Sequence, residues 1–355
     1  MKRKLLQIGN LTASVPLIQG GMGIGISLGR LAGAVAKEGG VGIISAAQIG
    51  FQEPDFAKDP LAANLRAMEQ ELKKARAIAP KGIIGFNIMV AMRNYEAYVK
   101  RAVEIGADLI VSGAGIPSKL PFYVGNSDIK LAPIVSTQKS AAVILRYWEK
   151  KYKRLPDMLV VEGPAAGGHL GFHLEELEYY QPSVYEEECR KILQTAADFG
   201  TRFGRKIPVA AAGGIDTPQA AAHMFEIGFD GIQVASRFVT TEECDAHIRY
   251  KESYLQACRE DIVIVKSPVG MPGRAIANDF IRQVEAGKRF PPKKCYQCLQ
   301  RCNPAEIPYC ITEALVQAAR GNVHEGLLFC GRNAYRAEKI ETVKEVIENL
   351  LPECV

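Results

Sequence analysis

One histidine in this sequence follows a run of small residues in a position suited to proton transfer. Residues 162–169 read Glu-Gly-Pro-Ala-Ala-Gly-Gly-His, so the imidazole of His169 ends a segment whose small side chains let a ligand approach closely. Imidazole titrates near neutral pH and can accept or donate a proton in an active site. A histidine that only packs or caps is the alternative, but the run follows an apolar, strand-like stretch, and catalytic side chains gather at strand ends in parallel α/β proteins. We therefore predict that His169 is the catalytic acid/base.

Two further segments have the composition of a phosphate-binding site. Residues 211–218 read Ala-Ala-Gly-Gly-Ile-Asp-Thr-Pro, in which Gly213 and Gly214 let backbone amides approach a phosphate. The Thr-Pro pair fits the cap and first position of a helix, whose amino end favours an anion. Residues 233–237, Gln-Val-Ala-Ser-Arg, add amides, a hydroxyl and the cation of Arg237. A plain turn with a surface arginine is the alternative, but both segments together predict a phosphate site.

A third region has the composition to lie against a flat ligand. Residues 19–23 read Gln-Gly-Gly-Met-Gly, and glycines leave room for a planar ring beside the backbone. Asn87 follows an apolar run, where its carboxamide needs a polar partner. The edge of a flavin ring offers donors and acceptors, whereas a hydrogen bond within the protein is the alternative.

Four cysteines near the end of the chain are spaced for metal binding. Cys295, Cys298, Cys302 and Cys310 form the pattern Cys-x2-Cys-x3-Cys-x7-Cys, and thiols so close together in a reducing compartment usually bind metal. Structural zinc sites usually have two Cys-x2-Cys pairs, and only one is present here. We predict a [4Fe-4S] cluster, with zinc as the second choice and free or redox-labile thiols as the third. Cys330 is a further candidate ligand.

The elements that must position these residues form a repeated strand–helix pattern. Eight short, nearly continuous apolar runs have the character of parallel strands buried on both faces. They cover residues 16–19, 41–45, 83–90, 108–112, 132–136, 158–162, 207–212 and 231–235. Amphipathic helical segments lie between them, among them residues 28–37, 95–105, 139–150, 185–204 and 217–227. Gly39, Gly106 and Gly228 follow such segments, and glycine is favoured there because the residue after a helix often adopts a left-handed backbone conformation.

Eight such units predict one closed (β/α)8 TIM barrel of the α/β class. An open, doubly wound sheet is the alternative, but it would want Gly-x-Gly-x-x-Gly after the first strand, and here the third glycine falls at Gly29. We predict a barrel domain over residues 1–288, with an eighth helix at 242–259 and an added arm at 262–287. Residues 289–355 form a cysteine-containing extension that ends in a helix at 337–351.

The composition is that of an ordinary globular protein. Of the 355 residues, 48% are hydrophobic and 23% are charged, and the formal net charge is +5. Basic residues do not alternate with aromatic ones, so nucleic-acid binding has no support. The sequence contains no apolar stretch long enough to cross a bilayer, and its basic start lacks the apolar region of a signal peptide. We expect a cytoplasmic protein, and the oligomeric state is open, with a homodimer as one option.

Together these segments resemble the nitronate monooxygenase superfamily, which includes the flavin-dependent enoyl-ACP reductases. The resemblance rests on residues 16–23, 85–87, 162–169, 212–215 and 233–238, in the family's order. It implies an FMN-binding barrel with His169 beside the flavin. It also implies FMN contacts from Gly21, Met22, Gly23, Asn87, Glu162, Gly167, Gly168, Gly213, Gly214, Gln233, Val234, Ala235 and Ser236. Relatives often have Gly-Thr where this chain has Ala235-Ser236, and the cysteine-containing tail resembles tails of anaerobe members.

The resemblance leaves two enzymatic functions open. One is the oxidation of an alkyl nitronate, with His169 as acid/base. The other is NAD(P)H-dependent reduction of an activated C=C bond, as in enoyl-ACP, and the mild basicity suits an acidic acyl carrier protein. A non-catalytic flavin- or cluster-binding module and a phosphosugar isomerase barrel are more distant alternatives. Residues 266–274 form a loop that contains Pro, Gly and two cations. This loop either covers the site, meets a nucleotide or is a surface connector.

Overall fold

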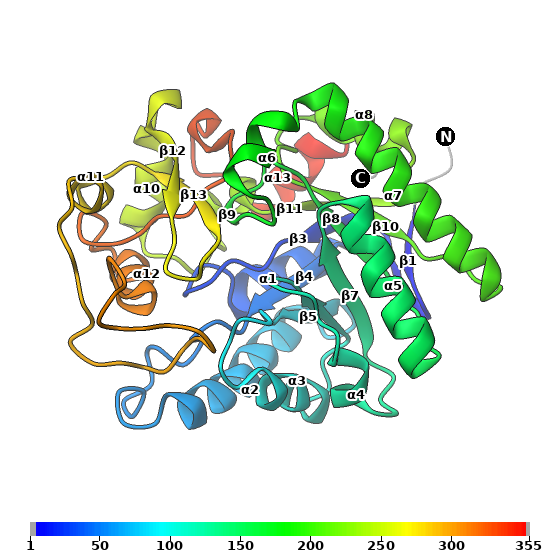
Figure 1. Ribbon diagram of the computed structural model, residues 1–355, viewed down its shortest axis with the longest axis horizontal. Coiled ribbons are helices and arrows are strands. Elements are labelled where there is room, and N and C mark those ends of the chain that lie inside the picture. The colour runs from blue at the N-terminus through cyan, green and yellow to red at the C-terminus, as the bar shows by residue number, and fades with distance from the viewer. Residues whose placement is uncertain (1–4, 353–355) are drawn as a thin grey trace.

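Eight parallel strands form a closed barrel at the centre of the protein (Figure 1). The computed structural model describes residues 5–352. The barrel strands are β3 (Leu17–Gln19), β4 (Val41–Ser45), β5 (Ile83–Asn87), β6 (Leu109–Ser112), β7 (Lys130–Val135), β8 (Leu159–Glu162), β10 (Val209–Ala212) and β11 (Gly231–Val234). They pair in the order β10-β11-β3-β4-β5-β6-β7-β8, and the two ends of this series pair with each other. Each strand overlaps one of the predicted runs, so the (β/α)8 barrel is confirmed and the open sheet is excluded.

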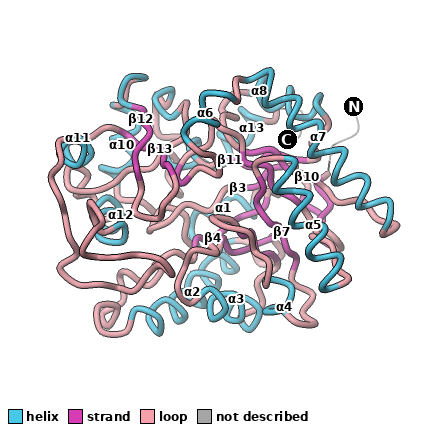
Figure 2. The backbone as a smooth tube through the Cα atoms, viewed as in Figure 1, coloured by secondary structure: helices cyan, strands magenta, loops and turns pink. Residues whose placement is uncertain are grey.

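Helices surround the barrel and bury its outer face (Figure 2). They include α1 (Gly29–Lys37), α2 (Pro60–Ile78), α3 (Tyr95–Glu104), α4 (Leu120–Val124), α5 (Gln138–Tyr152), α7 (Pro182–Arg202) and α8 (Pro218–Ile227). Amphipathic spacing places Leu31 of α1 and Leu72 of α2 in one buried cluster with Ile44 of the barrel. Trp148 of α5 is fully buried and donates its indole N–H to the carbonyl of Pro117 at 3.2 Å.

The predicted glycine turns have the expected backbone conformation. Gly39, Gly106 and Gly228 have φ angles of 88°, 75° and 119°, a region that side-chain-bearing residues rarely adopt. Each turn reverses the chain from a helix into the next strand, so these glycines set the short return connections of the barrel.

A hairpin closes the amino-terminal end of the barrel. Its strands, β1 (Leu6–Ile8) and β2 (Leu11–Ala13), are antiparallel. Leu6 and Ile8 are fully buried and belong to a cluster that includes Val41 and Leu109, which begin two barrel strands. This hairpin was not predicted from the sequence, because three-residue strands show too little alternation to detect.

The added arm lies over the opposite, carboxyl-terminal end of the barrel. Its strands β12 (Ile262–Lys266) and β13 (Pro272–Ile276) form a three-stranded sheet with β9 (Gly168–His169), and α11 (Asp279–Glu285) follows. The chain then continues through α12 (Ile311–Ala319) and α13 (Val343–Leu350), shown in orange and red in Figure 1. The arm therefore reaches back to the segment that contains the predicted catalytic histidine.

Two predicted helices are shorter than expected. The eighth helix, predicted at 242–259, is limited to α10 (Ile248–Gln256), because Asp245 is used elsewhere and accepts hydrogen bonds from the amides of Leu28 and Leu31 at the start of α1. The terminal helix, predicted at 337–351, begins only at Val343. A capping box fixes that start, in which the side chains of Thr342 and Glu345 each accept a hydrogen bond from the other's backbone amide.

The division of the chain at residue 288 stays a prediction, but the extension contacts the barrel closely. The backbone of Gly331 and Arg332 is hydrogen-bonded to loops that follow barrel strands. In the part of the chain from 5 to 352, no helix has the length and apolar character needed to span a membrane.

Candidate functional site

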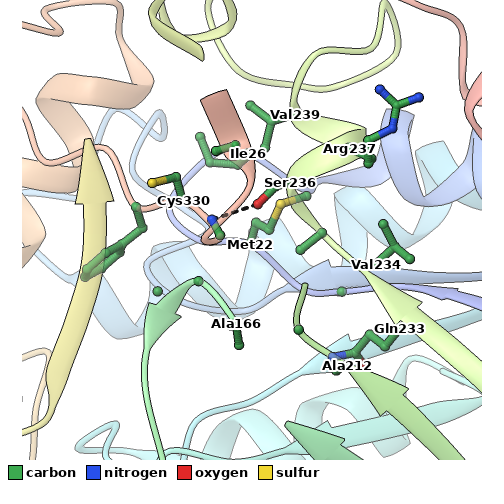
Figure 3. Close-up of a pocket in the computed structure, with 18 of the residues that line it drawn as sticks. Met22, Ile26, Ala166, Ala212, Gln233, Val234, Ser236, Arg237, Val239 and Cys330 are labelled. Atoms are coloured by element: carbon green, nitrogen blue, oxygen red, sulfur yellow. Dashed lines mark hydrogen bonds between the residues drawn. The ribbon is translucent and has the colours of Figure 1, made fainter. Parts of the chain in front are cut away.

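A cavity of about 410 Å³ opens at the carboxyl ends of the barrel strands, within the size range of small-molecule sites. All fourteen residues predicted for catalysis and FMN contact line it: Gly21, Met22, Gly23, Asn87, Glu162, Gly167, Gly168, His169, Gly213, Gly214, Gln233, Val234, Ala235 and Ser236. Figure 3 shows how residues from the first, sixth, seventh and eighth strand ends converge on it with residues of the extension. The barrel thus brings together segments that are far apart in the sequence.

His169 is held in place by the arm. It lies on β9, where it pairs with Gly273 of β13, and its imidazole Nε2 lies 2.7 Å from the hydroxyl of Ser267. The ring also meets Phe329 edge to face, with centroids 4.8 Å apart. Burial lowers the pKa of His169 to about 4, so the imidazole is neutral at physiological pH. A fixed, neutral imidazole that lines a cavity is suited to accepting a proton.

Glu162 provides a second titratable group in the same cavity. Burial raises the pKa of its carboxyl group to about 7, while the amide of Gly171 and the positive charge of Arg274 act in the opposite direction. Arg274 is itself buried and donates hydrogen bonds to the carbonyls of Ala166 and Pro164. It therefore fixes the small-residue loop that leads to His169.

Two glycines with positive φ angles shape the seventh strand end. Gly213 and Gly214 have φ angles of 96° and 77°. A Cβ atom on Gly213 would lie 2.8 Å from the amide nitrogen of Ala166, and one on Gly214 would lie 2.9 Å from Cβ of Ala165. Only glycine therefore permits this close approach of two loops. The predicted helix start is confirmed, since Thr217 caps α8 by accepting from the amide of Ala220 and Pro218 occupies the first turn.

The eighth strand end differs from the prediction in its cation. The hydroxyl of Ser236 lies on the cavity and accepts a hydrogen bond from the amide of Gly331 at 2.8 Å (Figure 3). Arg237, which we expected to face the phosphate, points away from Ser236 and forms an ion pair of 2.8 Å with Glu341. Its guanidinium is therefore engaged by the extension, a contact that local sequence could not reveal.

The first and third strand ends leave polar groups open to a ligand. A Cβ atom on Gly21 would lie 2.3 Å from Cβ of Asn87, so glycine is required for these segments to meet. Within residues 5–352 the carboxamide of Asn87 has no hydrogen-bond partner, and Oε1 of Gln233 is buried without one. Buried polar groups normally have partners, so Oε1 of Gln233 indicates a bound polar molecule, and the half-buried carboxamide of Asn87 lines the same cavity. The amide of Met22 is already hydrogen-bonded to the hydroxyl of Ser27 at 2.8 Å.

Two parts of the site were missed by sequence reasoning. Ser267 lies in the loop that we could assign either to the site or to the surface, and its contact with His169 spans 98 residues. The second part, residues 329–334 of the extension, also lines the cavity. A Cβ atom on Gly167 would lie 2.4 Å from the carbonyl of Cys330, so only glycine at this position allows the extension to pack so closely against the loop. The paired glycines before His169 were the only local signal of such a close approach.

The four spaced cysteines lie outside this cavity and are not arranged as a metal centre. Among residues 5–352 no group of three or more His, Cys, Asp or Glu side chains is placed to hold a metal ion. Cys295 and Cys302 are exposed, whereas Cys310 is buried. Burial is the main cause that raises the pKa of Cys310 to about 11, and the neighbouring Cys298 contributes, so this thiol is protonated. The expected [4Fe-4S] cluster and the zinc alternative therefore find no support in this arrangement.

Comparison with known proteins identifies the family of this chain. Residues 4–353 match the nitronate monooxygenase family. A probable nitronate monooxygenase of Staphylococcus saprophyticus is 25% identical over 80% of this chain and 81% of its own length. A carboxyl-CoA dehydrogenase of Rhodococcus jostii, named for a hydroxy-methyl-oxo-octahydro-indene substrate, is 21% identical over 96% and 92%.

Solved structures show the same architecture. FabK from Thermotoga maritima superposes with a TM-score of 0.73 at 24% identity, covering 96% of this chain and 93% of its own. Nitroalkane oxidase from Streptomyces ansochromogenes superposes with a TM-score of 0.70 at 19% identity, covering 96% and 95%. The family match spans almost the whole chain, from the hairpin to the final helix. This protein therefore belongs to the nitronate monooxygenase family and is a flavin-dependent oxidoreductase.

Proposed function

We propose that this protein is an FMN-dependent nitronate monooxygenase in which His169 is the acid/base. The observation that carries the proposal is the position of His169, whose partly buried imidazole lines the cavity and is held by Ser267 at 2.7 Å. Desolvation lowers the pKa of this imidazole to about 4, so the ring is neutral at physiological pH. Because the ring is neutral, it has a lone pair that can accept a substrate proton, and a negative charge that develops on a bound substrate would raise its pKa toward the operating pH.

The residues of the cavity fit FMN. The unpartnered amide groups of Asn87 and Gln233 match the hydrogen-bonding edge of a flavin ring. Gly21 lets the first strand end approach Asn87, and Gly213 and Gly214 let the seventh strand end approach the loop at Ala165 and Ala166, so these glycines shape the cavity walls that FMN would contact. The seventh strand end, with Gly213 and Gly214, is called the phosphate cradle below. Gly213, Gly214 and Ser236 would hold the phosphate.

Bound flavin supplies the redox chemistry, and the chain's own groups control access and protonation. His169 faces the substrate and accepts or returns its proton. Ser267 fixes the orientation of the ring, because its hydroxyl occupies one of the two imidazole nitrogens. Arg274 keeps the loop before His169 in place through the carbonyls of Pro164 and Ala166.

Oxygen uptake in the presence of an alkyl nitronate such as ethylnitronate tests this function. We expect FMN-dependent uptake by the wild-type protein. The His169→Ala variant should retain bound FMN and lose turnover, because the phosphate contacts lie elsewhere. Loss of FMN from that variant would show that His169 has a structural role, and absence of uptake by FMN-loaded wild-type protein would reject the nitronate substrate.

Reduction of an enoyl thioester is the second candidate, and a basic surface segment favours it. Five exposed cations, Lys288, Arg289, Lys293, Lys294 and Arg301, belong to a segment with few acidic residues. The bridge between Met92 and Leu299 attaches this segment to the loop after β5, on the same end of the barrel as the cavity. An acidic acyl carrier protein would complement these charges. Oxidation of NADH or NADPH that depends on an enoyl-ACP, and is slower with the free thioester, would support this candidate over the first.

Metal binding by the cysteine segment stays a separate prediction that rests on spacing alone. The thiols of Cys295, Cys298 and Cys302 influence one another's pKa, so they lie close together even though they form no ready metal site. Iron and zinc analysis of protein purified without oxygen tests the prediction. Stoichiometric iron that disappears in a Cys298→Ser variant would support a cluster, and metal-free protein with full FMN occupancy would reject it.

A further inference from the structure

Four arginines lie around the cavity, and three of them are already engaged. Arg237 pairs with Glu341, and Arg336 pairs with Asp216 at 3.0 Å. Arg274 donates to the carbonyls of the small-residue loop. The fourth, Arg332, lines the cavity and has neither an ion-pair partner nor a side-chain hydrogen bond among residues 5–352. Among residues 5–352, Arg332 is therefore the cavity-lining guanidinium without a carboxylate partner, whereas Arg237 is paired with Glu341 and keeps only its Nε donor unpaired.

Arg332 and its two neighbours in sequence are hydrogen-bonded to three of the loops that surround the cavity. The amide of Gly331 donates to the hydroxyl of Ser236 at 2.8 Å, and the amide of Arg332 donates to the carbonyl of Ala165 at 3.1 Å. Asn333 donates to the carboxylate of Asp216 at 2.8 Å, just after Gly214 in the sequence. Hydrogen bonds thus connect segment 331–333 to the loops after the sixth, seventh and eighth barrel strands.

The position of Arg332 relative to Gly214 follows from a shared neighbour. Ala165 accepts the hydrogen bond from Arg332, and its Cβ atom is the one that a side chain on Gly214 would meet at 2.9 Å. The backbone of Arg332 is thus hydrogen-bonded to the loop against which Gly214 packs. The pKa of Arg274 is lowered to about 10, mainly by burial and further by the positive charge of Arg332, so the two guanidinium groups lie near each other.

We propose that Arg332 binds the phosphate of the flavin mononucleotide, so that the extension completes the cofactor site. This inference rests on the proposed FMN cofactor. The cradle itself offers backbone amides and the Ser236 hydroxyl, all neutral, and the cation expected there, Arg237, is neutralised by Glu341. A phosphate dianion placed at the cradle would have Arg332 as its available counter-charge, and guanidinium groups bind phosphate with charge-assisted hydrogen bonds.

Comparison of two flavins that differ only in the phosphate tests the proposal. Apoprotein is titrated with FMN and with riboflavin, and flavin fluorescence reports each Kd. The Arg332→Ala variant should bind FMN at least about tenfold more weakly, the size of one lost charge-assisted hydrogen bond, and should bind riboflavin as the wild type does. Arg332→Lys should recover part of the loss. Arg146→Ala, which removes an exposed and unpaired arginine on α5, is the matched control for net charge and should change neither Kd.

The outcomes separate this inference from the proposed cofactor. Wild-type protein that binds neither flavin would reject the FMN site itself. Wild-type protein that binds FMN, with an Arg332→Ala variant of unchanged FMN affinity, would overturn the role of Arg332 alone. Equal weakening for FMN and riboflavin would also overturn it, because it would show that the substitution disturbs the cavity rather than the phosphate contact. A loss confined to the binding of NADPH would assign Arg332 to a different phosphate and overturn the proposal.

Discussion

A single methyl group at Gly214 should weaken FMN binding while a comparable change at the other end of the same helix does not. Gly214 precedes α8 and Gly228 ends it, and both have positive φ angles, of 77° and 119°. Alanine at either position therefore strains the backbone, at a cost of about 1–2 kcal/mol in folding free energy. The two sites differ in what the new Cβ atom meets.

The magnitude follows from the contacts. At Gly214 the Cβ atom would lie 2.9 Å from Cβ of Ala165, whereas ordinary contact begins near 3.4 Å, so the two loops must separate by about half an ångström. At Gly228 the nearest atom is the flexible Cδ1 of Leu193 at 3.5 Å, and nothing has to move. A shift of that size takes a hydrogen bond of about 2.9 Å out of the favourable range. Loss of one charge-assisted hydrogen bond, about 1.5 kcal/mol or more, weakens binding at least about tenfold.

The assay combines urea unfolding with fluorescence titration of FMN. We expect Gly214→Ala to lose at least as much stability as Gly228→Ala, and only Gly214→Ala to lose FMN affinity. A folded Gly214→Ala protein with the wild-type Kd for FMN would refute the assignment of the phosphate to this loop. A Gly228→Ala protein with equally weakened FMN binding would show that strain in α8, rather than the local contact, controls affinity.

Three further predictions concern the titratable groups and their supports. Ser267→Ala should lower kcat about tenfold and leave the Kd for FMN unchanged, because the substitution removes the hydroxyl that holds the imidazole of His169 at 2.7 Å. Steady-state kinetics with a nitronate measure kcat, and an unchanged kcat would contradict this prediction. Glu162→Gln should gain stability relative to the wild type as pH rises from 5 to 8, by at most about 3 kcal/mol. The folded-state pKa of about 7 exceeds the usual 4.5, so the wild type loses stability as pH rises from about 4.5 to about 7, and the loss is complete above pH 7. Urea unfolding at the two pH values measures this, and a pH-independent difference would contradict it. In the Glu162→Gln background, kcat/KM should not change between about pH 6 and pH 8, because the neutral form of His169 is lost only as pH falls through its pKa of about 4. A fall in kcat/KM below about pH 6.5 would show instead that His169 has the pKa of an unperturbed imidazole.

The strands and strand ends were predictable because their signal is local. Each barrel strand is buried on both faces, so its sequence is a continuous apolar run such as that of β4. The carboxyl ends of parallel strands meet at one end of a barrel, so the order of the runs along the chain was enough to place Gly21, Asn87, His169 and Gly214 together.

The remaining parts of the site depend on contacts between distant segments. Ser267 and His169 meet through pairing of β13 with β9, and the sequence around Ser267 does not encode that register. Arg237 looked like a phosphate ligand in its own segment, but Glu341 from the extension engages it. The extension lines the cavity through residues 329–334, an irregular stretch without the periodicity that would predict its path.

For the cysteine segment, the sequence pattern predicted a metal site that the described arrangement does not contain. Its spacing is typical of metal binding, yet spacing along the chain does not fix where the thiols point. Cys310 immediately precedes α12 and is buried, while Cys295 and Cys302 are exposed in the loop before it. The sequence pattern and the described arrangement therefore lead to different expectations, which metal analysis can decide.

The most direct test of the central claim is an equilibrium titration of the wild-type apoprotein with FMN, followed by flavin absorption and fluorescence. The site described at the strand ends predicts saturable binding of one FMN per chain, retained in His169→Ala and weakened in Gly214→Ala. A folded wild-type protein that shows no saturable FMN binding would contradict the account of this cavity as a flavin site.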